Sequence, residues 1–107
     1  MDYKLALIGF GNVGQGLAEI LARKAPLLRE KFDADIRIVA ICDLNKGSIA
    51  DPNGFDPQAL LDHVNEKGDL EDFPAADSGW DARETIEKGG ANVLVERRAV
   101  PYRPQDR

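Results

Sequence analysis

Three short apolar runs along the chain predict buried β-strands. They occupy residues 4–8 (KLALI), 37–42 (RIVAIC) and 92–96 (NVLVE). Apolar runs of this length, without alternating polar positions, are typical of strands buried on both faces of a parallel sheet. The three runs therefore predict the centre of such a sheet.

Helical spacing marks the segment after the first run. Apolar residues recur there about once per helical turn, at Val13, Leu17, Ile20 and Leu21. Because Pro26 has no backbone donor, we expect it to kink or divide this helix, with the apolar residues of 27–32 forming a second piece.

Cap residues place two further helices. Asp56 is a favourable N-cap, Pro57 suits the first helical position and Gly68 suits the end, so these residues bound one helix. Ser78 can cap a last short helix, with Asp81 three residues later at the capping-box position.

The predicted order of elements is β-α-β-α-α-β, with loops over 44–57 and 69–80, which are rich in Gly, Pro, Asn and Asp. This alternation indicates an α/β fold, a three-stranded parallel sheet with right-handed crossovers and flanking helices. The open edge of so small a parallel sheet favours pairing with another chain. We therefore expect self-association into a homo-oligomer through the exposed sheet edge.

Composition narrows the partners and the compartment. The 107 residues are enough for one small domain, and the net charge of −5 argues against a nucleic-acid partner. The single cysteine, Cys42, excludes an internal disulfide and favours a reducing cytoplasm. The sequence shows no signal-peptide pattern and no stretch long enough to span a membrane.

A glycine-rich loop follows the first predicted strand and opens the first predicted helix. Gly9, Gly11 and Gly14 form the pattern G-x-G-x-x-G in the strand–helix context that dinucleotide binding requires. The three glycines would allow a tight turn, close approach of a pyrophosphate, and close helix packing, respectively. The backbone N–H groups at the start of the helix and the positive end of its dipole would then face the anion. These N–H groups belong to Phe10, Gly11, Asn12 and Val13. The alternative is a glycine-rich turn used only for packing.

An acidic residue ends the second predicted strand, where dinucleotide-binding proteins bond the adenosine ribose. Asp43 occupies this place, farther downstream than the usual spacing of about 20 residues. Asp43 favours NAD, whereas Lys46 could meet the 2′-phosphate of NADP. The sequence leaves both cofactors open. It also leaves open that Asp43 is only an exposed carboxylate at a strand end and that Lys46 is only a solvated loop lysine.

The other chemically interesting residues do not assemble into a catalytic or metal site. His63 lacks a second His or Cys partner and is expected to face solvent. Cys42 is expected to be buried and inert. Trp80 and Phe73 are expected to cover the sheet rather than to stack on a base.

Several segments beyond the glycine loop carry a family resemblance. "LALIGFGNVGQGLAEIL" closely resembles the start of homoserine dehydrogenases, and "RIVAICD" resembles their second strand. "GSIADPNGFDPQALL", "GDLEDFP", "GWDARETI" and "ANVLVE" are also similar to that family. The resemblance covers residues 4 to about 96.

This resemblance implies a partial Rossmann-type NAD(P)-binding domain over residues 1–96, with sheet order 2-1-3. The family interconverts homoserine and aspartate semialdehyde with NAD or NADP. By resemblance, residues 9–14 would hold the pyrophosphate, and Asp43 and Lys46 would lie near the ribose. The family's catalytic domain has no counterpart in this chain, so we expect the chain alone to be inactive.

Residues 97–107 depart from the family and are expected to form an irregular tail. The codons of "PYRPQDR", read one base later, can encode Pro-Thr-Asp-Pro-Lys-Thr-Gly. That peptide resembles the Pro-Thr loop which follows the third strand in homoserine dehydrogenases. An out-of-frame tail is therefore one hypothesis, and a short protein with a disordered polar end is the other.

Two functional hypotheses follow. The first is the NAD(P)-binding fragment of a homoserine dehydrogenase. The alternative is a small non-catalytic module that binds a dinucleotide or regulates another protein by docking its sheet edge.

Overall fold

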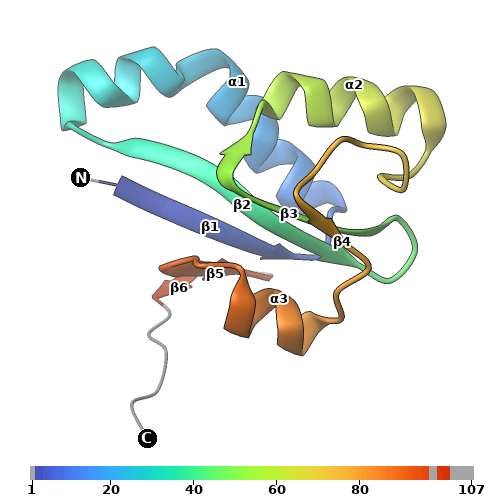
Figure 1. Cartoon of the computed structure of the whole chain (residues 1–107). Coiled ribbons are helices and arrows are strands. Elements are labelled where there is room, and N and C mark those ends of the chain that lie inside the picture. Colours follow the sequence, from blue (N-terminus) through green and yellow to red (C-terminus); the bar gives the residue numbers. More distant parts are fainter. Residues whose placement is uncertain (1, 97–98, 102–107) are drawn as a thin grey trace, which may run out of the picture.

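The computed structural model describes residues 2–96 and 99–101, and it has one sheet with helices on both faces (Figure 1). Helices α1 and α2 lie on one face and α3 lies on the other. The helices are α1 (Asn12–Phe32), α2 (Pro57–Lys67) and α3 (Ala82–Lys88). The strands are β1 (Asp2–Ile8), β2 (Asp35–Asp43), β3 (Gly47–Phe55), β4 (Asp77–Ser78), β5 (Val93–Val95) and β6 (Ala99–Pro101).

The three predicted strands form the parallel centre of the sheet. Strand β1 pairs with β2 on one side and with β5 on the other, both in parallel. The expected order 2-1-3 is therefore confirmed as β2-β1-β5. This arrangement brings the carboxyl ends of β1 and β2 together, which is where open α/β sheets bind ligands.

The sheet is larger than predicted and is mixed rather than parallel. Its order is β4-β3-β2-β1-β5-β6, and β3 pairs antiparallel with β2. The prediction of a loop over 44–57 was therefore wrong for most of that segment. The composition of this segment indicated turns, but its backbone forms hydrogen bonds with β2. The segment also buries three apolar side chains, those of Ile49, Ala50 and Phe55.

The two outer strands are short. Strand β4 pairs antiparallel with β3 at Ile49 and Ala50, inside the second segment predicted to be a loop. Strand β6 pairs antiparallel with β5, so the expected tail is not irregular at residues 99–101. The rest of that tail, 97–98 and 102–107, lies outside the described residues.

Helix α1 runs without interruption through Pro26, so the expected division of the helix is wrong. A proline in a helix removes one backbone hydrogen bond, which favourable packing on either side can offset. Leu21 is fully buried before Pro26, and Leu28 packs against the core after it. Both halves of the helix are thus held on the sheet.

The face of α1 that meets the sheet begins with two small residues and continues with a leucine. Gly14, Ala18 and Leu21 are buried, whereas Val13 and Ile20 are each 51% exposed. The apolar spacing therefore predicted the helix correctly but does not by itself identify its buried face. Small residues let the helix approach the strands closely.

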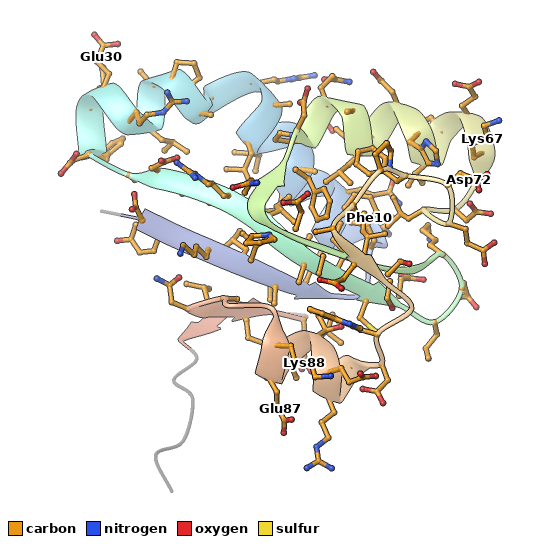
Figure 2. All side chains as sticks on the ribbon, in the orientation of Figure 1. Phe10, Glu30, Lys67, Asp72, Glu87 and Lys88 are labelled. Atoms are coloured by element: carbon orange, nitrogen blue, oxygen red, sulfur yellow. The ribbon has the colours of Figure 1, made fainter. Side chains whose placement is uncertain are left out.

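Two apolar clusters hold the layers together. The larger lies between the sheet and the α1–α2 layer and includes Leu7, Phe10 and Leu60, each fully buried. The smaller lies on the α3 side and is built largely from alanines. Phe10 lies among the inner side chains of Figure 2, whereas Glu30, Lys67 and Glu87 extend outward.

The ends of α2 are as predicted. The Asp56 carboxylate accepts a hydrogen bond from the backbone N–H of Gln58 at 3.0 Å, and Pro57 occupies the first turn. Gly68 ends the helix in the left-handed conformation, with φ of 81°.

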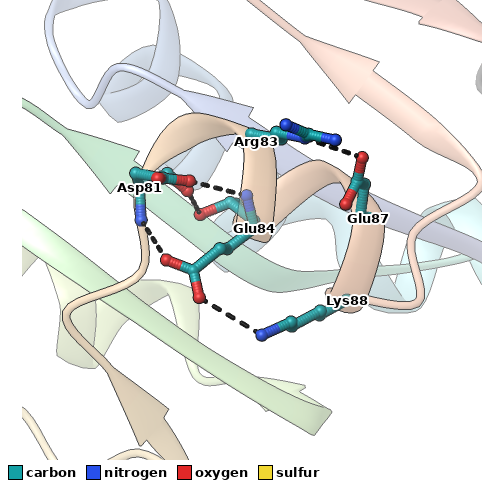
Figure 3. A network of polar contacts seen from close by, with 6 residues as sticks. Asp81, Arg83, Glu84, Glu87 and Lys88 are labelled. Carbon is teal, nitrogen blue, oxygen red and sulfur yellow. Dashed lines mark hydrogen bonds and ion pairs between the residues drawn. The ribbon is translucent and has the colours of Figure 1, made fainter.

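The N-cap of helix α3 lies three residues later than predicted, at Asp81 and not at Ser78. The Asp81 carboxylate accepts from the Glu84 N–H at 2.8 Å, and the Glu84 carboxylate accepts from the Asp81 N–H at 3.4 Å (Figure 3). This reciprocal pair is a capping box, and Ser78 belongs instead to β4.

His63 does not face solvent as expected. Its Nε2 atom is buried without a hydrogen-bond partner among the described residues, and its ring lies edge-on to Phe73, with 5.3 Å between ring centroids. Phe73 in turn packs edge-on against Phe55 at 5.7 Å. His63 therefore acts as part of the aromatic packing that covers β3.

Candidate functional site

The glycine loop joins β1 to α1 at the carboxyl end of the parallel strands. Gly9 has a φ of 101°, which glycine adopts readily, and its N–H donates to the Cys42 carbonyl of β2 at 2.7 Å. A Cβ on Gly14 would lie 2.9 Å from the Gly9 carbonyl oxygen, too close for any larger residue. The loop is therefore packed tightly against both the strand and the helix.

The start of α1 is open, in contrast to its packed base. A Cβ built on Gly11 meets no atom within 4 Å, so space remains in front of this residue. Gly11 is the N-cap of α1 and provides no side-chain cap, and the first turn contains no acidic residue. An uncapped helix start presents backbone N–H groups and the positive end of the dipole to a ligand.

Phe10 differs from its predicted role. Its N–H donates to Asp43 Oδ2 at 2.7 Å, and its ring is fully buried, so this N–H is directed into the protein and not toward a ligand. The other predicted donors, Gly11, Asn12 and Val13, belong to the start of α1. The group of candidate anion donors is thus one residue shorter than the sequence indicated.

The Asp43 carboxylate binds backbone from two loops. Oδ2 accepts from Phe10, and Oδ1 accepts from the N–H groups of Asn45 and Lys46 at 2.9 Å each. Burial, the largest single influence, raises the pKa of Asp43, but the three backbone donors and the Lys46 charge together hold that pKa below its usual range. Asp43 is therefore a carboxylate that organises the site as well as a candidate ligand for a ribose.

Lys46 lies beside Asp43, as the predicted site requires. Its N–H binds the Asp43 carboxylate, and its carbonyl accepts from the Leu70 N–H at 2.8 Å. The backbone of Lys46 is thus fixed on both sides, and its positive charge lowers the pKa of Asp43.

A cavity of about 620 Å³ opens next to the loop. Two of the residues that line it, Leu44 and Trp80, were not predicted from the sequence to belong to the site. The cavity is lined by Gly9, Asp43, Leu44 and Trp80, among others. Trp80 packs against the smaller core cluster, as expected, but also lines this cavity. Leu44 is fully exposed at its mouth. Their positions in the chain could have indicated this, because Leu44 follows β2 and Trp80 precedes α3 at the same end of the sheet.

Sequence reasoning also missed Gln15. Its side-chain Nε2 donates to the Phe10 carbonyl at 2.8 Å, which ties the helix back to the loop that precedes it. The fingerprint places no requirement on this residue, so the pattern contained no signal for it.

The described residues contain neither a candidate metal site nor a helix that could span a membrane. No group of three or more His, Cys, Asp or Glu side chains within 2–96 could hold a metal ion. Within the same part of the chain, no helix is long and apolar enough to cross a membrane.

Comparison with known proteins gives one matching family model. Residues 2–96 match the model of Glutamate/Leucine/Phenylalanine/Valine dehydrogenase. This range contains the glycine loop, Asp43 and all three helices.

Curated relatives and solved structures agree on homoserine dehydrogenases. The chain is 30% identical over 95 residues to the NAD(+)-dependent homoserine dehydrogenase of Pseudomonas canavaninivorans, covering 89% of this chain and 27% of that protein. It is 26% identical over 92 residues to the homoserine dehydrogenase of Methanocaldococcus jannaschii, covering 86% and 27%. A hyperthermophilic archaeal homoserine dehydrogenase in complex with NADPH superposes with a TM-score of 0.69 at 28% identity, covering 91% and 28%.

These comparisons confirm the resemblance inferred from the sequence. The chain spans about a quarter of the length of the curated relatives it matches.

Proposed function

The chain belongs to the Glutamate/Leucine/Phenylalanine/Valine dehydrogenase family, and we propose that it is the NAD(P)-binding part of a homoserine dehydrogenase. In the whole enzyme this part would hold the cofactor for hydride transfer between homoserine and aspartate semialdehyde. One relative is named as NAD(+)-dependent and another was solved with NADPH, so the proposal includes both cofactors.

The observation that carries the proposal is the open start of α1. Gly11 leaves space for an anion, and neither a side-chain cap nor a first-turn acid competes for the helix start. We assign the pyrophosphate to the loop over 9–14, with Gly11, Asn12 and Val13 as donors and Gly9, Phe10 and Gly14 as its framework. The residues present therefore fit a dinucleotide.

The ribose is assigned to Asp43 and Lys46. The Asp43 carboxylate already accepts three backbone bonds, two at Oδ1 and one at Oδ2, but a carboxylate has about four lone-pair sites, so capacity for one ribose hydroxyl remains at Oδ2. Lys46 beside it would partly offset the repulsion between Asp43 and a 2′-phosphate. The adjoining cavity, walled by Leu44 and Trp80, would take the adenosine end.

When bound, the cofactor supplies the hydride chemistry. The residues of this chain would bind and orient it, and we assign none of them a catalytic role. We therefore expect dinucleotide binding but no turnover of homoserine by this chain alone.

A pair of glycine substitutions tests the binding site. A Cβ at Gly11 or at Gly16 would meet no atom within 4 Å, so both Gly11→Ala and Gly16→Ala are expected to fold. Calorimetric titration with NAD and NADP should show binding at least tenfold weaker for Gly11→Ala and unchanged for Gly16→Ala. Equal affinities for the wild type and Gly11→Ala would contradict the assigned site.

The reading frame of the last residues is a separate proposal. We propose that codons 97–107 are translated out of frame, which is supported by the Pro-Thr-containing peptide available one base later. Sequencing the gene past codon 97 tests this. The expected result is a shifted frame that continues into dehydrogenase-like sequence, and a frame without such sequence would refute it.

Self-association and a cytoplasmic location complete the proposal. Strand β4 pairs with β3 at only two positions, which leaves part of the β3 edge for a second chain. The single buried Cys42 suits a reducing compartment. Size-exclusion chromatography at increasing concentration is expected to show a dimer, and a monomer at every concentration would contradict self-association.

A further inference from the structure

We propose that Gln15 is a positioning residue that aims the Gly11 N–H at the pyrophosphate. This inference rests on the proposed function, because it concerns the same glycine loop. It assigns a role to a side chain that the glycine fingerprint leaves unspecified.

Two successive peptide groups of the loop are each held by a side chain. Asp43 Oδ2 accepts the Phe10 N–H at 2.7 Å, which fixes the peptide between Gly9 and Phe10. Gln15 Nε2 donates to the Phe10 carbonyl at 2.8 Å, which fixes the next peptide, between Phe10 and Gly11. The Phe10 ring is fully buried, so the residue between the two peptides is anchored as well.

The second of these peptides contains the Gly11 N–H. The peptide is planar and trans, so its carbonyl and its N–H point in nearly opposite directions. Holding the Phe10 carbonyl on Gln15 therefore fixes the direction of the Gly11 N–H, away from Gln15. Without this bond, the conformational freedom of Gly11, which follows the peptide, would let the peptide rotate easily.

The chemistry of the side chain also suits an anion site. Glutamine donates a hydrogen bond without carrying charge. A glutamate at the same position would lack the donor and would repel a phosphate. Gln15 therefore orders the loop without changing the charge that the ligand meets.

A matched pair of substitutions tests this role. Gln15→Met removes the donor but keeps the length of the side chain. Gln58→Met is the control. Gln15 and Gln58 both line a groove between α1 and α2, but Gln58 donates to Asp62, at 2.9 Å, rather than to the loop. We expect Gln15→Met to bind both NAD and NADP about tenfold more weakly, as for one lost hydrogen bond, and Gln58→Met to bind both normally.

An NMR measurement separates positioning from general stability. The Gly11 amide resonance should move in Gln15→Met and stay in place in Gln58→Met, while both variants melt at similar temperatures. An unmoved Gly11 resonance, or wild-type affinity in Gln15→Met, would overturn the inference. If Gln15→Met does not fold, Gln15→Glu, which also lacks the donor, is measured by the same resonance.

The two proposals fail in different ways. If the wild-type chain binds neither NAD nor NADP, the proposed function fails, and the Gly11 resonance still decides whether Gln15 orients the peptide. If the wild type binds and Gln15→Met binds equally well, only the role of Gln15 fails.

Discussion

The three helices begin in two different ways. Helices α2 and α3 each start at an aspartate, Asp56 or Asp81, whose carboxylate accepts a backbone N–H of the first turn. Figure 3 shows the closed arrangement at α3, where Glu84 returns a bond to the Asp81 N–H. Helix α1 starts at Gly11, with no side-chain cap.

The difference separates helix starts that stabilise themselves from one that is available to a ligand. A capping carboxylate occupies the N–H groups and the positive dipole that an anion would need. Helix α1 has 21 residues and buries Ala18 and Leu21 against the sheet, so its packing can replace the missing cap. Helix α3 has only seven residues and relies more on its capping box.

The largest effect on stability is expected at Gly14, which packs the open helix against its loop. A Cβ there would lie 2.9 Å from the Gly9 carbonyl, so Gly14→Ala should lower the free energy of unfolding by about 1–3 kcal/mol. The matched change Gly16→Ala meets no atom and should raise it by roughly 0.5–1 kcal/mol through helix propensity. Urea unfolding measures both, and a Gly14→Ala variant that is stabilised as much as Gly16→Ala would show that close packing at Gly14 is unimportant.

An intermediate effect is expected at the closed start of α3. Asp81→Ala removes the acceptor of the capping box and should cost about 1 kcal/mol in urea unfolding. Arg83→Ala, which removes only an exposed ion pair with Glu87, should leave the free energy of unfolding nearly unchanged. Equal losses in the two variants would contradict the claim that the cap stabilises α3 more than the exposed ion pair does.

The smallest effect is the pH dependence that Asp43 contributes. Because its pKa is lowered in the folded state, its stabilisation is complete above the unfolded pKa, about 4, and is lost as pH falls through the folded pKa. The stability difference between the wild type and Asp43→Asn should therefore shrink below about pH 4. A difference that stays constant from neutral to acidic pH would contradict the bonding of this carboxylate.

Local patterns were sufficient for part of this fold. The apolar runs of β1, β2 and β5, the Asp56 and Gly68 boundaries of α2, and the packing of Gly14 all depend on residues close in sequence. Strand β3 escaped prediction because its burial comes from pairing with β2, which its turn-like composition conceals.

The candidate site was likewise predictable only where it depends on residues close in sequence. The glycine spacing predicted the loop, its open helix start and the neighbouring Asp43. The bond from the Phe10 N–H to Asp43 joins residues 33 positions apart, so no local pattern could indicate that this donor is already engaged. The roles of Gln15 and Trp80 likewise depend on how the segments meet in space.

The most direct test of the account gives α1 the kind of start that α2 and α3 have. Gly11→Asp would place a carboxylate at the N-cap, which helices favour, so the fold should be as stable as the wild type or slightly more stable. Titration of the wild type and Gly11→Asp with NAD and NADP is the measurement. We expect the wild type to bind and Gly11→Asp to show no detectable binding, whereas undiminished binding by Gly11→Asp would contradict the claim that the open helix start holds the pyrophosphate.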